Sequence, residues 1–65
     1  MDIKEPEYQV TELSIVTDET IEEALNQVTA QGWIFDSIHF VNRENSRRPS
    51  MAFLFFIREK KENAT

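Results

Sequence analysis

The residues of this 65-residue chain that could do chemistry are few. Ser37 and His39 stand two apart in "IFDSIHF", with Asp36 directly before Ser37, and these are the residue types of a nucleophile, a base and an acid. On a strand, Ser37 and His39 would share a face at about 6.6–7 Å between Cα atoms, while Asp36 would point the opposite way. Such an arrangement lacks a hydrogen-bonded base and an oxyanion hole. We therefore expect no catalysis, and we expect His39 to be a half-buried polar residue or part of a subunit contact.

An acidic cluster is the second candidate, formed by Asp18, Glu19, Glu22 and Glu23. Calcium loops need alternating carboxylates and a turn glycine, and this cluster has neither. The dipole of a helix favours negative charge at its start, so we interpret the cluster as a helix N-terminus. The chain has no cysteine and one histidine, which excludes disulfides, thiolate zinc sites and multi-histidine sites. We expect no metal and no cofactor.

Three arginines, Arg43, Arg47 and Arg48, form the one locally basic stretch in a chain of net charge −5. A solvated loop is the ordinary interpretation, but the arginines could also contact a phosphate, an acidic partner protein or the acidic helix start of a neighbouring subunit. The stretch "AFLFFI" overlaps part of the aromatic strand of RNA-recognition domains, but its basic-glycine start is absent. The negative net charge also disfavours phosphate backbones and anionic membranes. We expect neither nucleic acid nor membrane as a partner.

One helix is predicted in "TDETIEEALNQVTAQG". Its apolar residues follow a spacing of three and four and form one stripe: Ile21, Ala24, Leu25 and Val28. Thr20 with Glu23 fits a capping box, and Thr17 or Asp18 is an alternative cap one turn earlier. Gly32 supplies a left-handed residue that ends the helix.

Three strands are predicted around this helix, at residues 8–16, 33–42 and 51–59. In the first, the apolar positions change face near Glu12, which indicates a bulge or twist. In the second, strict alternation puts Trp33, Phe35, Ser37, His39 and Val41 on one face, and Ile34, Asp36, Ile38 and Phe40 on the other. The polar segment "NRENSRRPS" closes a hairpin between the second and third strands.

These elements predict an α+β fold of order β-α-β-β. The first two strands run in the same direction on either side of the helix, and the apolar third strand lies between them. The sheet is thus three-stranded and mixed, in the order 1-3-2, with one helix on one face. We expect residues 1–65 to form a single domain, with a flexible arm at 1–7 and a flexible tail at 60–65.

The stretch "EALNQVTAQGWIFDSI" resembles a bacterial family known as domain of unknown function 4177. The matching positions are Tyr8, Val10, Glu22, Leu25, Asn26, Gly32, Trp33 and Arg58. The resemblance covers about residues 7–60 and implies a β-α-β-β fold, without an established activity or catalytic residue. The longer polar arm and the more aromatic last strand depart from the family pattern.

The last strand, in "SMAFLFFI", is apolar on both faces, while one helix can cover only one of them. A chain of this length is barely able to stabilise its own core, and an exposed apolar face promotes association. We expect two subunits to press their open sheet faces together, as a homodimer or a higher oligomer. The sequence leaves open which face of the last strand lies under the helix, and with it which face of the second strand is uncovered. The predicted contact residues are Phe53, Leu54, Phe55, Phe56, Ile34, Ile38 and Phe40.

The sequence determines no activity. We expect a small homo-oligomeric interaction or accessory module without catalysis, for which Arg43, Arg47 and Arg48 are possible partner contacts. The alternative is a binder of a small apolar ligand between subunits, near Trp33, His39 and Phe40. The start "MDIKEPE" lacks the pattern of a signal peptide, and no apolar run approaches the roughly 20 residues of a membrane span. We therefore expect a cytoplasmic bacterial protein.

Overall fold

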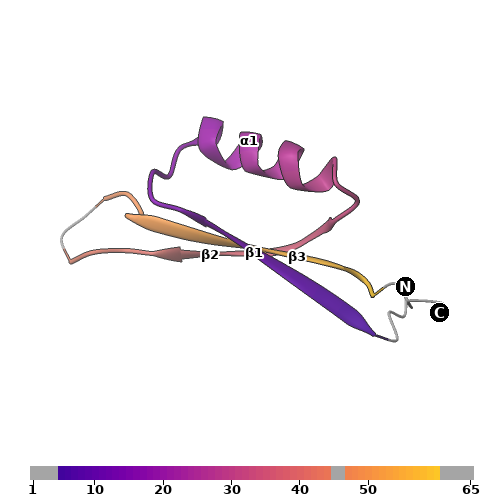
Figure 1. Ribbon diagram of the computed structural model, residues 1–65. Helices are drawn as coiled ribbons and strands as arrows, with labels where there is room; N and C mark the ends of the chain where they lie inside the picture. The colour runs from indigo at the N-terminus through magenta and orange to yellow at the C-terminus, as the bar shows by residue number, and fades with distance from the viewer. Residues whose placement is uncertain (1–4, 45–46, 61–65) are drawn as a thin grey trace.

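The computed structural model describes residues 5–44 and 47–60. The chain forms β1 (Pro6–Leu13), α1 (Asp18–Thr29), β2 (Ile34–Val41) and β3 (Met51–Glu59). The helix lies along one side of the sheet (Figure 1). The predicted arm and tail lie mainly outside the described residues, but Pro6 and Glu7 already belong to β1, and the Lys60 amide donates a hydrogen bond to the Glu5 carbonyl at 2.8 Å.

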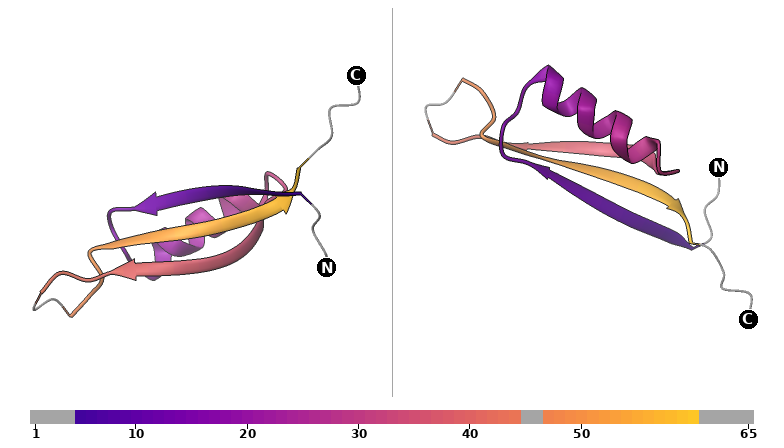
Figure 2. Two further views of the ribbon diagram at one scale, coloured as in Figure 1. Left: turned by 90° about the horizontal axis from the view of Figure 1, so that it is seen from below. Right: turned by 45° about the horizontal axis from the view of Figure 1, so that its top comes forward.

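The sheet has the order β1-β3-β2, which confirms the expected topology and the α+β class. β3 pairs antiparallel with both of its neighbours. β1 and β2 therefore run in the same direction, as expected, but they are not adjacent, so the sheet is antiparallel throughout and not mixed as predicted. Figure 2 shows β3 between the other two strands, with α1 behind the sheet in the left-hand view.

The helix begins at a reciprocal cap one turn earlier than the Thr20–Glu23 pair. The Thr17 hydroxyl accepts a hydrogen bond from the Thr20 amide at 3.1 Å, and the Thr20 hydroxyl accepts one from the Thr17 amide at 2.9 Å. Thr17 is thus the N-cap, the alternative that the sequence left open. After the C-cap residue Ala30, Gly32 adopts a φ of 94°, the left-handed conformation expected of it.

The irregularity of the sheet lies in β2 rather than in β1. The β1–β3 register is continuous from Pro6 opposite Glu59 to Leu13 opposite Ala52, so of the bulge or twist predicted near Glu12, the bulge is wrong. The β2–β3 register shifts between Phe35 and Ser37. Asp36 is the extra residue, and the residues after it point to the opposite face from the one that strict alternation predicts.

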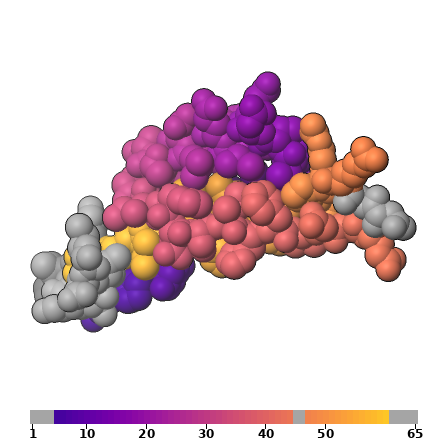
Figure 3. Space-filling view, turned by 180° about the vertical axis from the view of Figure 1, so that it is seen from behind, coloured from indigo at the N-terminus to yellow at the C-terminus, as the bar shows by residue number. Residues whose placement is uncertain are grey.

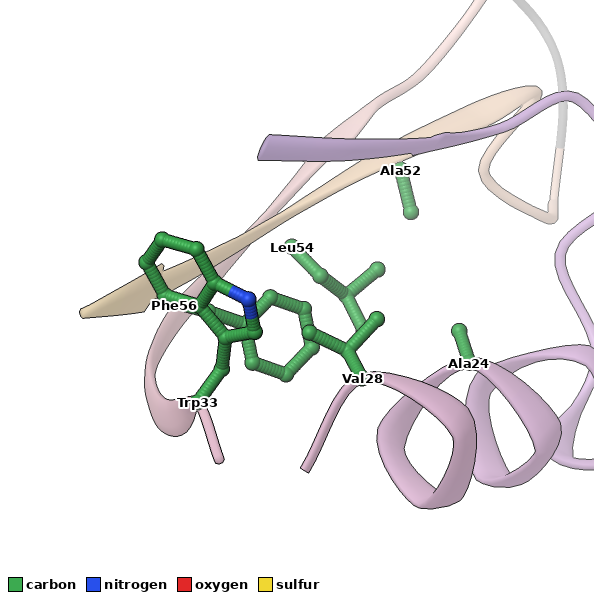
Figure 4. Close-up of a cluster of buried hydrophobic side chains, with 6 residues drawn as sticks. All are labelled: Ala24, Val28, Trp33, Ala52, Leu54 and Phe56. Carbon is green, nitrogen blue, oxygen red and sulfur yellow. The ribbon is translucent and has the colours of Figure 1, made fainter. Parts of the chain in front are cut away.

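The core lies between α1 and the sheet (Figure 4). Its buried residues are Ala24, Val28, Trp33, Ala52, Leu54 and Phe56. The helix contributes the stripe predicted from its spacing, and β3 contributes one of its two faces. Leu13, Val16, Ile21, Leu25 and Ile38 pack around this centre.

Trp33 closes the core at the end of the helix. The guanidinium of Arg58 lies 3.9 Å from the centre of the Trp33 ring, and Arg58 Nε donates to Glu7 Oε1 at 2.8 Å. The side chains of Arg58 and Glu7 are each 39% exposed, so this ion pair is partly screened by water. The three residues connect the ends of β1 and β3 to the residue that follows the helix.

Candidate functional site: the open face of the sheet

The two faces of β3 can be assigned from its register, because cross-strand partners project to the same side of a sheet. Ala52, Leu54 and Phe56 project toward α1 and are fully buried. Phe53 and Phe55 alternate with them and project to the side opposite the helix. We call the side beneath α1 the covered face and the opposite side the open face.

The open face is built from three rows that run across the strands β1, β3 and β2. The rows are Tyr8–Ile57–Ile34, Val10–Phe55–Ser37 and Glu12–Phe53–His39. Met51 and Val41 add an incomplete row beyond His39. Seven of the nine side chains in these three rows, all except Glu12 and Ser37, are apolar or carry a ring.

Nothing in the described part of the chain covers this face. In Figure 2 the left-hand view looks onto the sheet from the side opposite α1, and no other element lies in front of it. Tyr8 is 58% exposed, and Val10 and Ile34 are each 51% exposed. The central side chains of β3 are half-buried by these neighbours alone. The open face is therefore a continuous apolar patch of the kind that marks interaction sites.

The polar side chains Ser37 and His39 of the open face each contact a different neighbour. The Ser37 hydroxyl donates to Asp36 Oδ2 at 3.3 Å, and His39 packs edge-on against the Phe55 ring at 5.2 Å between ring centres. Ser37 and His39 face the same side, as predicted, but no hydrogen bond between them is found among residues 5–44 and 47–60. Within those residues, no group of three or more His, Cys, Asp and Glu side chains could hold a metal ion.

The predicted contact residues divide between the two faces. Phe53, Phe55 and Ile34 lie on the open face. Leu54 and Phe56 lie in the core at 0% exposure and are not available for contact.

The placement of Ile38 and Phe40 is also corrected. The strict alternation that grouped them with Ile34 fails at Asp36, so both lie on the covered side, opposite Leu54 and Ala52. The corrected open face gains residues that the prediction left out, among them Tyr8, Val10, Ile57 and Val41. The spacing of Tyr8 and Val10 by two residues, together with the order 1-3-2, was the signal that could have placed them there.

The residues of the alternative ligand site are not brought together. Trp33 lies in the core beyond one end of β2, while Phe40 lies near the other end. His39 lies on the open face, so it points away from both. Phe40 is 48% exposed and borders a wide groove of about 520 Å³ between the start of α1 and the hairpin, with Ile21 and Pro49 among its other lining residues.

The arginines of the hairpin loop, Arg43, Arg47 and Arg48, are exposed. Figure 3 shows the described residues on either side of positions 45–46 beyond one end of the helix and sheet. Arg48 also lines the groove beside Phe40, together with Asp18 and Glu19 of the helix start. Part of the acidic cluster predicted to cap the helix thus lies near one arginine of the loop.

None of the described helices is long and apolar enough to cross a membrane. Comparisons with protein-family models, with curated proteins and with solved structures find no match to this chain. The resemblance to domain of unknown function 4177 stays a prediction.

Proposed function

We propose that this protein is a small homo-oligomeric interaction module without catalysis, in which two copies bury their open faces against each other. The observation that supports this proposal is the contrast between the two sides of the sheet. The covered side has a helix over it, whereas the apolar rows of the open face have no covering element in the described residues.

The size of the open face suits a second copy of the chain. Its apolar side chains expose roughly 600 Å² per chain, so two stacked copies would bury about 1,200 Å², the lower end of the range for specific interfaces. Completing the burial of each half-exposed apolar side chain is worth about 1 kcal/mol. A 65-residue chain with a core of a few buried residues has much to gain from this.

The distribution of side chains on the open face also resembles that of an interface. Phe53 and Phe55 lie on the central strand, whereas Glu12 and His39 lie on the two edge strands. Interfaces commonly have an aromatic centre and a polar rim. Two sheets stacked over β3 would keep Glu12 and His39 near water at their edges while burying the phenylalanines.

In this proposal the hairpin loop is a second contact region. Arg43, Arg47 and Arg48 would bind an acidic protein partner while the open face binds the second copy. The absence of cysteine is compatible with a bacterial cytoplasmic protein, which is the setting we propose.

Sedimentation equilibrium at micromolar concentrations tests the proposal. We expect the protein to sediment at twice its 7.7 kDa chain mass, and the Phe55→Asp variant to sediment as a single chain because a carboxylate would be buried at the centre of the contact. Phe40→Asp is the matched control, since it places the same charge at an exposed phenylalanine on the covered side, and it should remain a dimer. A wild-type protein that sediments as a single chain, without binding a dye for exposed apolar patches, contradicts the proposal.

A further inference from the structure

Two ionisable side chains of the open face lie in one row, at its two ends. Glu12 of β1 and His39 of β2 are both paired with Phe53 of β3, and both are exposed. Neighbouring strands lie about 4.8 Å apart, so the backbones of Glu12 and His39 within one chain are separated by roughly 10 Å. Phe53 lies between them. Within a single chain, the carboxylate and the imidazole therefore point outward from opposite edges of the sheet.

Two identical faces can stack symmetrically in two simple ways. The two-fold axis must lie in the plane between the sheets, because only then do the same faces meet. An axis along β3 places β1 of one copy over β2 of the other and keeps every row level. An axis across the strands places β1 over β1 and reverses the order of the rows. Both arrangements keep the strands of the two sheets aligned, as packed sheets usually are.

The two arrangements place Glu12 against different residues. With the axis along β3, Glu12 of each copy lies opposite His39 of the other, and Tyr8 lies opposite Ile34. With the axis across the strands and through the Phe53 row, Glu12 would lie opposite its own equivalent, which places like charges together.

An axis across the strands through the Phe55 row also gives His39 no complementary partner. It would place Glu12 opposite Tyr8 and leave His39 opposite Ile34, so that His39 would face an apolar side chain and gain no polar partner. Only the axis along β3 gives both ionisable side chains a complementary partner.

We infer that the two copies stack with their two-fold axis along β3, so that the Glu12 carboxylate of each copy accepts a hydrogen bond from the His39 imidazole of the other. This inference rests on the proposed dimer and specifies its geometry. His39 packs edge-on against Phe55, which holds the imidazole on the open face. His39 lies in the row Glu12–Phe53–His39, in which Glu12 is the one carboxylate. The contact occurs twice in each dimer and selects a second copy as the partner.

Mixing two charge variants tests this geometry. In a homodimer of the Glu12→Lys chain, both contacts pair a lysine with His39. In a homodimer of the His39→Glu chain, both contacts pair two glutamates. A mixed dimer instead contains one lysine–glutamate contact and one native Glu12–His39 contact. We expect native mass spectrometry of the mixture to show roughly tenfold more mixed dimer than random pairing gives. A chain carrying both substitutions should form homodimers again, because the axis along β3 gives it two lysine–glutamate contacts. An axis across the strands through the Phe53 row would instead place lysine opposite lysine and glutamate opposite glutamate in that chain.

Glu22→Lys mixed with Asn26→Glu is the matched control, because it changes the net charges by the same amounts at exposed positions on α1. This mixture should pair at random. When the wild type is dimeric, random pairing of the Glu12 and His39 variants, or a doubly substituted chain that stays monomeric, overturns the axis along β3 but leaves the dimer intact. A wild type that is monomeric in the same instrument overturns the proposed function itself. Circular dichroism of each variant confirms that it is folded.

Discussion

The two faces of β3 are both apolar but have different surroundings. Leu54 and Phe56 on the covered face are fully buried, while Phe53 and Phe55 on the open face are only half-buried. The difference comes from α1, which lies over one side of the sheet (Figure 1). Burial along this strand is therefore decided by what covers each face and not by the hydrophobicity of the residues. A covered face stabilises one chain, whereas an open face of similar chemistry is available to stabilise an assembly.

The comparison also shows how little the helix covers. α1 spans Asp18–Thr29 and buries only Ala24 and Val28 of its own residues. Even on the covered side, Phe35 stays 40% exposed, although its ring meets Phe56 edge-on at 5.9 Å between ring centres. A single 12-residue helix is thus barely wide enough for one face of this sheet. This narrow cover makes a second covering element for the other face more valuable.

The largest effect is expected on the covered face. Phe56→Ala should destabilise the fold by about 3–5 kcal/mol, because it leaves a cavity in a core that has few other members. That is comparable to the whole stability of a small domain, so the variant should be largely unfolded. Urea unfolding followed by circular dichroism measures the change. A loss below about 1 kcal/mol would mean that Phe56 is not the centre of the core.

The matching substitution on the open face should act mainly through association. Phe55→Ala should cost about 1–2 kcal/mol, and its main effect should be that the melting temperature no longer depends on protein concentration. The wild type should melt at higher temperature as its concentration rises, because dilution dissociates the dimer. The measurement is a melting series over a hundredfold dilution. Such a dilution changes the stabilisation that association provides by roughly 2.7 kcal/mol. A wild type whose melting temperature does not change with dilution contradicts this account.

Weakening the helix should lower stability without changing how the open faces meet. Thr17→Ala removes the hydroxyl that accepts the Thr20 amide and should destabilise the chain by about 1 kcal/mol. Thr17→Ser keeps the hydroxyl and serves as the control. Both variants should remain dimers when they are folded, as measured by light scattering. Loss of the dimer in Thr17→Ala, while circular dichroism still showed a folded helix, would mean that the cap of α1 also affects dimerisation through the open face.

The smallest effect is expected at the end of the core. Arg58→Met removes the guanidinium over the Trp33 ring and the ion pair with Glu7, and should cost about 0.5–1 kcal/mol because both charged side chains are partly exposed. Trp33 is the only tryptophan, so its fluorescence reports the change directly. The deficit relative to wild type should shrink in high salt as the ion pair is screened. A deficit that grows with salt would exclude an electrostatic role for Arg58.

The sequence predicted the elements and their order because these depend on local signals. The helix follows from the stripe that includes Ala24 and Val28, and its end follows from Gly32, whose φ is positive. The central place of β3 follows from its two apolar faces. These features require no knowledge of which residues meet across the sheet.

The contact surface was predicted less well because it depends on pairing. A bulge arises when two strands are matched residue by residue, and no local pattern distinguished Asp36 from Glu12 as its site. Because the bulge at Asp36 was not predicted, Ile38 and Phe40 were grouped with Ile34 on one face. The choice between Leu54 and Phe55 as the core residue could not be made from β3 alone, since both faces of that strand are apolar. It required the position of α1.

Isotope-filtered nuclear magnetic resonance on a mixture of labelled and unlabelled chains tests most directly whether two copies cover each other's open faces. We predict contacts between chains from Phe55, Ile57 and Val10, and none from Leu54 or Phe56, which lie in the core of each chain. Contacts between chains that arise from exposed residues of α1, or the absence of any such contacts at concentrations where the protein is fully folded, would contradict the account.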